Sequence, residues 1–138
     1  MLIQRIKISN FKTYLSLDLD LTVDDDRPII LIGGSNGGGK TTLFEAISGA
    51  LYGLKIESKE HFMELLNQGA VNKVKPEISL QITFVGKVLG QQQKYILKRN
   101  YILNPQGRPL ESVSLNMNGN MYAVSYTHLR AHETGRNL

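Results

Sequence analysis

The segment from Ile29 to Ala46, IILIGGSNGGGKTTLFEA, constrains the fold more than any other part of this chain. Its first four residues are all apolar, and a strand without a polar side belongs in the middle of a sheet covered on both faces. From Thr41 onward, apolar residues recur at helical spacing as far as Gly53, which is well placed to end a helix. The segment therefore predicts a buried strand, a glycine-rich loop and a helix in direct succession.

The loop GSNGGGKT satisfies the phosphate-loop pattern G-x-x-x-x-G-K-[ST], and it lies between a strand and a helix as that pattern requires. A triphosphate is enclosed when successive backbone N–H groups point inward, and glycine permits both the backbone angles and the close approach that this needs. The N-terminus of a helix adds unpaired N–H groups and the positive end of its dipole. The residues predicted to form this cradle are Gly34, Ser35, Asn36, Gly37, Gly38 and Gly39.

Three side chains follow the cradle where we expect the helix to begin, near Lys40. We expect the Lys40 ammonium to contact the β and γ phosphates, the Thr41 hydroxyl to bind Mg²⁺, and Thr42 to touch the α phosphate. The simpler interpretation is a glycine-rich turn with an exposed lysine, but chance matches to this pattern usually lack the strand and the helix. A dinucleotide-binding fingerprint would need neither the lysine nor the threonine. The sequence therefore predicts binding of a nucleoside triphosphate with Mg²⁺.

Hydrolysis needs a further acidic residue, at the end of a second apolar strand, to hold Mg²⁺, and a group that activates water. Asp24–Asp26 follow a short apolar run but lead directly into Pro28, so three aspartates in a solvated turn fit better. Glu45 lies one turn after Thr41, and we interpret it as an acid of the first helical turn rather than as a base. The sequence therefore predicts no catalytic residue in this chain.

The rest of the chain predicts antiparallel hairpins. Polar and apolar residues alternate on both sides of NFKTY and again over 77–84, with a return strand around 95–101. Asn118 and Gly119 form a strong signal for a further hairpin turn. A short second helix is expected within 58–69, ended by Gly69. The predicted class is α/β: a mixed sheet with antiparallel hairpins around a central strand–loop–helix unit.

Composition excludes several classes of protein. The chain has no cysteine, so disulfides and thiolate metal sites are excluded, and its net charge of +4 is too small to indicate nucleic-acid binding alone. The start lacks the apolar core of a signal peptide, and no run approaches membrane-spanning length. We therefore expect a cytoplasmic protein with no membrane partner.

The last residues form a segment of a different kind. The stretch VSYTHLRAHET, Val124 to Thr134, resembles the translation, in one frame, of a transposase adapter used in DNA sequencing. We therefore expect residues 1–123 to form the natural domain, cut short near Ala123. Residues 124–138 are expected to be an adapter-derived tail without packing partners.

The order IQRIKISNFKTY, LDLDL and IILIGGSNGGGKTTLFEAISGALYG resembles the N-terminal lobe of the ABC-type ATPases of chromosome maintenance and repair. That group includes the structural maintenance of chromosomes (SMC) proteins, RecF, RecN and SbcC, and the resemblance covers Leu2 to Gly53. Its first strand ends in Asn-Phe-Arg/Lys, which here is Asn10, Phe11 and Lys12. The resemblance implies that ATP is the ligand and that Lys12 approaches its phosphates, although a solvated loop lysine fits as well.

Within this group the sequence is most similar to DndD, the ATPase associated with DNA phosphorothioate modification, in GGGKTTLFEA, ALYG, LLNQGA and the pair ISLQITF and YILKRNY. The resemblance implies a coiled coil and a C-terminal lobe that carries the signature motif, a Mg²⁺-binding aspartate and a catalytic glutamate. It also implies that ATP is sandwiched between two heads. We therefore expect ATP hydrolysis only in the intact protein, with the missing C-terminal lobe, a second identical head and DNA as partners, in DNA repair or phosphorothioate modification.

Two other classes remain open from the residues alone. A phosphate-loop nucleotide kinase would need an arginine-rich lid after the first helix, and a non-catalytic adaptor would bind ATP for structure only. A smaller alternative concerns the return strand, where Lys98 and Arg99 with Tyr95 and Tyr101 offer either a basic, aromatic face for DNA or ordinary cross-strand packing.

Overall fold

The computed structural model describes residues 1–23 and 38–128. The predicted central strand, Ile29–Ile32, and the cradle residues Gly34, Ser35, Asn36 and Gly37 lie outside the described residues, as do Asp24–Asp26.

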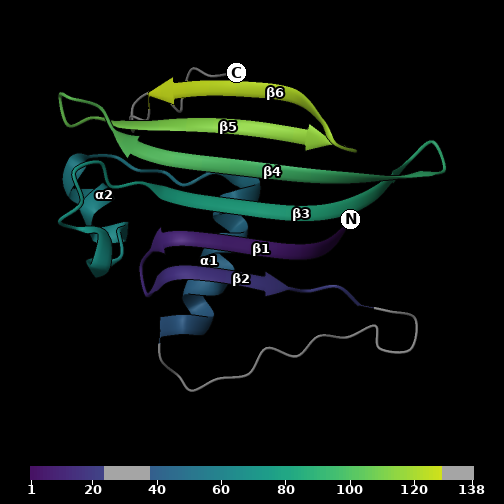
Figure 1. The fold of residues 1–138 in the computed structure, drawn as a ribbon, viewed down its shortest axis with the longest axis horizontal. Coiled ribbons are helices and arrows are strands. Elements are labelled where there is room, and N and C mark those ends of the chain that lie inside the picture. The colour runs from purple at the N-terminus through teal and green to yellow at the C-terminus, as the bar shows by residue number, and fades with distance from the viewer. Residues whose placement is uncertain (24–37, 129–138) are drawn as a thin grey trace.

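The described strands form one six-stranded antiparallel sheet in the order β2-β1-β3-β4-β5-β6 (Figure 1). Each neighbouring pair of strands except β1 and β3 is joined by a short hairpin connection, so the predicted hairpins are confirmed. The strands are β1 (Leu2–Phe11), β2 (Tyr14–Asp20), β3 (Ile78–Val88), β4 (Gln91–Leu103), β5 (Pro109–Met117) and β6 (Asn120–His128).

Two of the hairpins turn on residue pairs with positive φ. Asn118 and Gly119 have φ values of 52° and 90°, as the Asn-Gly signal predicts. Leu89 and Gly90 have φ values of 53° and 80°, although leucine rarely adopts this conformation. Since Leu89 is 99% exposed, its side chain contributes no packing that would compete with the turn.

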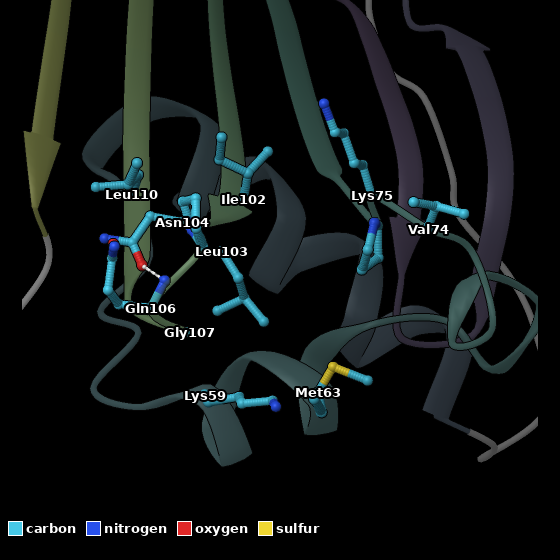
Figure 2. A pocket seen from close by; sticks show the side chains of 12 residues that line it. Lys59, Met63, Val74, Lys75, Ile102, Leu103, Asn104, Gln106, Gly107 and Leu110 are labelled. Atoms are coloured by element: carbon cyan, nitrogen blue, oxygen red, sulfur yellow. Dashed lines mark hydrogen bonds between the residues drawn. The ribbon is translucent and has the colours of Figure 1, made fainter.

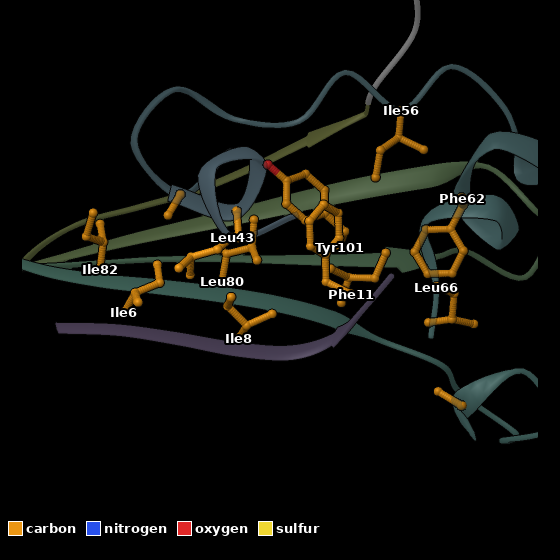
Figure 3. Packing of buried hydrophobic residues seen from close by; sticks show 14 of the residues in the cluster. Ile6, Ile8, Phe11, Leu43, Ile56, Phe62, Leu66, Leu80, Ile82 and Tyr101 are labelled. Carbon is orange, nitrogen blue, oxygen red and sulfur yellow. The ribbon is translucent and has the colours of Figure 1, made fainter. Parts of the chain in front are cut away.

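Helix α1 (Gly38–Tyr52) covers one face of the sheet (Figure 1). Ala46 and Ala50 of this helix are fully buried, and a Cβ on Gly49 would come within 3.0 Å of the Leu80 side chain on β3. These small residues let the helix backbone approach the sheet closely. The core fills the space between the helix and the sheet (Figure 3) and contains Ile6, Ile8, Phe11, Leu43, Ile56, Phe62, Leu66, Leu80, Ile82 and Tyr101.

The second helix is shorter than predicted. Helix α2 (Lys59–Leu65) is capped by the Ser58 side chain, which accepts a hydrogen bond from the backbone N–H of His61. The prediction that it runs to Gly69 is wrong, because Leu66 turns to an extended conformation and forms a β-bridge with Phe11. A 3₁₀ turn, η1 (Gln68–Ala70), follows and includes Gly69.

The C-terminal strand extends past the predicted domain boundary at Ala123. Residues 124–128 continue β6 and pair with β5, from Ser114 opposite Val124 to Leu110 opposite His128. The expectation that this stretch has no pairing partner is therefore wrong for 124–128, while 129–138 lie outside the described residues. A strand edge pairs through backbone groups alone, so an added segment of almost any sequence can extend it.

Neither described helix, α1 or α2, has the length and apolar character needed to cross a membrane.

Candidate nucleotide-binding site

The N-terminus of α1 carries the described part of the predicted site. The helix begins at Gly38, two residues earlier than the predicted start near Lys40. Side-chain periodicity cannot reveal this start, because glycine has no side chain to contribute to the pattern. The first four N–H groups of a helix have no partner within it, so those of residues 38–41 are the ones left for a ligand or a loop.

The three side chains of this first turn differ in exposure. Lys40 is partly exposed and Thr41 is exposed, whereas Thr42 is only 4% exposed. Within residues 1–23 and 38–128, no ion pair or hydrogen bond engages the Lys40 side chain. Of the two threonines, Thr41 is therefore the one whose hydroxyl can reach an ion in solution.

Lys12 lies against the middle of α1 and pairs with Glu45. Its Nζ is 2.7 Å from a Glu45 carboxylate oxygen and 5.8 Å from the centre of the Phe11 ring, and the two charged side chains are 30% and 42% exposed. The interpretation of Glu45 as a first-turn acid is wrong, because the earlier helix start places it in the third turn. Glu45 follows Lys40 by five residues, which is about 7.5 Å along the helix axis.

The backbone around Lys12 is held in a fixed, left-handed conformation. Asn10 and Lys12 have φ values of 60° and 49°. The Lys12 N–H donates to the Leu65 carbonyl at 2.7 Å, and the Asn67 side-chain amide donates to the Lys12 carbonyl, also at 2.7 Å. The Asn67 N–H in turn donates to the Asn10 carbonyl at 3.0 Å.

Asn67 was not predicted to matter, although it belongs to the stretch LLNQGA that carries part of the family resemblance. Its side-chain oxygen also accepts from the Gly69 N–H at 2.8 Å, which closes the 3₁₀ turn. Asn67 thereby connects the turn between β1 and β2 to the segment after α2. The signal available in the sequence was an asparagine two residues before a glycine in a loop, a common turn pattern.

The C-terminus of α1 meets a cluster of polar side chains from β4 and β5. Arg99 donates from Nε to the Ala50 carbonyl at 2.9 Å and from Nη2 to the Leu51 carbonyl at 3.1 Å. Its Nη1 lies 3.3 Å from Glu111, and both charged side chains are nearly buried, at 14% and 12% exposure.

Tyr101 completes this cluster. Its hydroxyl donates to Glu111 at 2.5 Å and accepts from the Leu54 N–H at 2.8 Å. Burial raises the pKa of the Tyr101 phenol well above its usual value, and the hydrogen bond to Glu111 adds to the effect. The phenol therefore stays neutral and remains a donor toward the carboxylate.

The structure argues against a basic, aromatic DNA-binding face on β4. Arg99 and Tyr101 lie opposite Leu80 and Ile78 of β3 and face α1, whereas Lys98 is opposite Gln81 on the other face of the sheet. The two cations therefore do not share a surface.

A groove of about 760 Å³ opens between α2 and the turn that joins β4 to β5 (Figure 2). Its walls are mostly apolar, with two lysines at Lys59 and Lys75 and no carboxylate. The side-chain oxygen of Asn104 accepts from the Gln106 N–H and shapes the turn (Figure 2). Of the predicted nucleotide-binding residues that the structure describes, none lines this groove.

In the described ranges, no group of three or more histidine, aspartate or glutamate side chains could hold a metal ion. The predicted Mg²⁺ ligand within these ranges is therefore the Thr41 hydroxyl.

Comparison with known proteins agrees with the predicted fold and family. A family model described as an AAA domain (AAA_23) matches residues 5–124. The SbcC subunit of the nuclease SbcCD from Staphylococcus aureus strain MRSA252 is 26% identical over 97 residues, which cover 69% of this chain and 10% of that protein. Its counterpart in strain JH9 is 38% identical over 48 residues, 35% of this chain and 5% of that protein. The chain thus spans a tenth or less of these relatives.

A structure solved in a study of ATP-driven dimerization and DNA stimulated activation of SMC ATPases has a similar fold. Its TM-score is 0.53 at 21% identity, and the match covers 89% of this chain and 73% of that one. This likeness confirms the predicted fold class, an α/β lobe of the phosphate-loop NTPase type.

Proposed function

Since this chain belongs to the AAA domain family AAA_23, we propose that it is the N-terminal, ATP-binding lobe of a DNA-associated ABC-type ATPase of the SMC and SbcC class. ATP hydrolysis belongs to the intact protein, in which a C-terminal lobe supplies the residues absent here.

The observation that carries this proposal is the position of GSNGGGKT relative to α1. The helix starts inside the motif, which supports a role for its first-turn N–H groups as donors to phosphate oxygens. Lys40 follows in the same turn as a cation for the β and γ phosphates, and Gly34, Ser35, Asn36, Gly37, Gly38 and Gly39 supply backbone N–H groups around them.

The described residues fit a bound Mg²⁺ ion through one ligand. Thr41 is exposed at the helix start and offers a hydroxyl, a hard oxygen donor of the kind Mg²⁺ prefers. When bound, the ion neutralises charge that develops on the phosphates. We also propose that Thr42, which is only 4% exposed, touches the α phosphate.

Lys12 is proposed as a second cation near the phosphates. The positive φ of Lys12 and its bonds to Leu65 and Asn67 fix the backbone beside α1, so only the side chain has to move. In the present structure the Lys12 ammonium is paired with Glu45, with 2.7 Å between its nitrogen and a carboxylate oxygen. A bound triphosphate would compete with this carboxylate for Lys12.

The proposed partners are the missing C-terminal lobe, a second copy of the head and DNA. The similar SMC structure comes from work on ATP-driven dimerization and DNA stimulated activation, and the relatives are subunits of a nuclease. With DNA as a partner, the protein is expected in the cytoplasm. The role is DNA repair or, following the likeness of GGGKTTLFEA and LLNQGA to DndD, phosphorothioate modification or restriction.

We also propose that the natural domain is residues 1–123 and that 124–138 derive from an adapter. The family match ends at residue 124, next to the proposed boundary at Ala123. Amide exchange tests this proposal: pairing across β5 and β6 should protect the backbone up to His128 only weakly, because β6 lies at the edge of the sheet. Protection in 126–138 as strong as in β3 would contradict the proposal.

A nucleotide kinase and a non-catalytic adaptor are the rivals. After α1 the structure places the long strands β3 and β4 rather than an arginine-rich lid, which disfavours the kinase. The uncut reading frame separates all three, because coiled-coil heptads beyond residue 123 are expected only for the SMC and SbcC class.

The test of the proposed function is Lys40→Ala. We expect MgATP affinity to fall about 100-fold, since a hydrogen-bonded cation at a phosphate contributes roughly 1.5–3 kcal/mol. The melting temperature should stay unchanged, because this side chain has no core contacts to lose. Lys7→Ala on the sheet is the matched control and should bind MgATP normally. Equal MgATP affinity of Lys40→Ala and the wild type would refute the assignment.

A further inference from the structure

The polar cluster at the C-terminus of α1 satisfies the carbonyls that a helix end leaves free. The last four C=O groups of a helix have no partner within it. Here the Gly53 N–H donates to the Gly49 carbonyl at 2.8 Å, and Arg99 donates to the carbonyls of Ala50 and Leu51. A fixed cation at this end also complements the negative pole of the helix dipole.

The Arg99 side chain is itself fixed from the other side. Glu111 on β5 accepts from Nη1, and the same carboxylate oxygen accepts from the buried Tyr101 hydroxyl. Tyr101 in turn accepts from the Leu54 N–H, just beyond the helix. The helix end is therefore bonded to two neighbouring strands through three side chains, all with little exposure to solvent.

The planar guanidinium makes this set of contacts possible for arginine but not for lysine. It presents donors in a rigid fork, so one side chain reaches two successive carbonyls and a carboxylate at once. A lysine has the same charge on one flexible nitrogen and cannot hold all three acceptors in this geometry. Gly53, at a φ of 92°, leaves the space: a Cβ there would lie 3.2 Å from Glu111 and 3.4 Å from Arg99.

We propose that Arg99 is a positioning residue for the nucleotide site, which it sets through the axis of α1. The inference rests on the proposed function, because it assigns the far end of the same helix to phosphate binding. Arg99 fixes one end of a rigid helix, and Lys40 and Thr41 sit in the first turn at the other end.

The length of the helix sets the expected size of this effect. Lys40 and Ala50 are ten residues apart, which is about 15 Å of helix. A tilt of roughly 5° about the Arg99 end would move Lys40 by about 1 Å. Displacements of about 1 Å at a site that positions charged groups can change function by up to about 100-fold.

The experiment measures MgATP affinity by calorimetry and melting temperature by circular dichroism, on the 138-residue chain. Arg99→Lys keeps the charge and loses the fork, and we expect it to fold with a lower melting temperature and to bind MgATP about tenfold more weakly. Glu111→Gln removes the carboxylate charge that pairs with the guanidinium, leaves the size of the side chain at position 111 almost unchanged, and should weaken binding about threefold. Arg5→Lys, in the exposed pair with Asp18 on the same sheet, is the matched control and should bind within twofold of the wild type.

A purely structural role would lower the melting temperature and leave affinity unchanged when titrations are made in the cold, where each variant is folded. Wild-type affinity in both Arg99→Lys and Glu111→Gln would therefore overturn the inference. Glu111→Gln decides the matter alone if Arg99→Lys does not fold. If the wild type binds MgATP, Lys40→Ala loses that affinity and the Arg99 and Glu111 variants keep it, only the positioning role is refuted. If the wild type does not bind MgATP, both the positioning role and the proposed function are refuted.

Discussion

The two ends of α1 differ in how their backbone groups are satisfied. At the C-terminal end, Gly53 and the Arg99 guanidinium occupy three successive carbonyls, and nearly buried side chains hold the guanidinium in place. At the N-terminal end the helix opens with two glycines, and Thr41 is exposed. Within 1–23 and 38–128, no side chain caps this first turn.

Under the proposed function, the C-terminal end of α1 anchors the helix and its N-terminal end binds the nucleotide. A ligand site needs donors that are free until the ligand arrives, and free donors contribute nothing to holding the helix in place. The opposite end can be fully bonded, because no ligand has to displace its partners. Loss of binding groups should therefore change function without changing stability, and loss of the anchor should change both.

The largest expected effect is on the rate of ATP hydrolysis, because we expect neither end of α1 to provide a catalytic residue. We propose that the chain positions phosphates through Lys40 and Thr41, and its sequence predicts no water-activating residue, so we expect no ATP hydrolysis above background by the purified chain. Positioning alone leaves most of the barrier in place, and the intact protein should exceed this background about a millionfold or more.

Phosphate release by the purified chain tests this expectation, and mixing it with a separately expressed C-terminal lobe should restore activity. Steady release by the chain alone, abolished by Lys40→Ala, would show that the N-terminal end of α1 carries a catalytic group that we have missed.

The second prediction tests the anchored end through Gly53→Ala. The substitution forces alanine to a φ of 92° and places its Cβ against Glu111 and Arg99. The left-handed conformation alone costs about 1–2 kcal/mol, and displacement of the cluster should bring the loss of unfolding free energy to about 2–3 kcal/mol. Denaturant unfolding at neutral pH measures it.

Gly119→Ala is the control for that measurement. Gly119 has a similar φ of 90°, but a Cβ there meets nothing within 4 Å. It should show the conformational cost alone, so the difference between the two variants isolates the cluster. Equal losses would mean that the polar groups at the end of α1 accommodate a methyl group freely, and the contrast between the two helix ends would weaken.

The third prediction concerns Lys12 and Glu45, the ion pair at the middle of α1. Lys12→Ala should weaken MgATP binding two- to fivefold, and Glu45→Gln should strengthen it by a similar factor, because the carboxylate no longer competes for the ammonium. The size follows from the roughly 0.2–1 kcal/mol typical of partly exposed ion pairs.

Glu64→Gln, an exposed carboxylate on α2, is the matched control for the charge change in Glu45→Gln. Weaker binding in Glu45→Gln would indicate that this pair holds Lys12 in its working position rather than away from the phosphates.

Local sequence signals predicted the elements well. The alternation around β1, β2 and β3, the Asn-Gly turn at 118–119 and the helix end before Gly53 depend on neighbours in the chain, and all are confirmed. The early start of α1 and the early end of α2 were mispredicted because glycine carries no periodic signal and because Leu66 is drawn into the bridge with Phe11.

The contacts between distant segments could not be predicted in the same way. Glu45 and Lys12 are 33 residues apart, and Arg99 reaches Ala50 across 49. Both contacts depend on where α1 crosses the sheet and on the register of β4, which one sequence does not specify. Side-chain alternation in a strand puts Lys98 and Arg99 on opposite faces, but the sequence did not specify which of the two faces α1.

The smallest expected effect comes from the exposed pair Arg5–Asp18. Its contribution to stability is the reference for that of the nearly buried pair Arg99–Glu111. A hydrogen bond from Arg5 lowers the pKa of the Asp18 carboxyl, although both side chains are almost half exposed, at 48% and 45%. A lowered pKa means that any stabilisation is present above the unfolded value of about 3.9 and is lost as the pH falls through the folded value. Asp18→Asn should therefore shift the melting temperature at pH 7 by no more than about 4 °C, and the shift should vanish near pH 2. Melting curves of the wild type and Asp18→Asn across this pH range measure both quantities. A shift at pH 7 as large as that of Arg99→Lys would mean that exposure does not separate the two pairs, and that the anchoring of α1 cannot be attributed to burial.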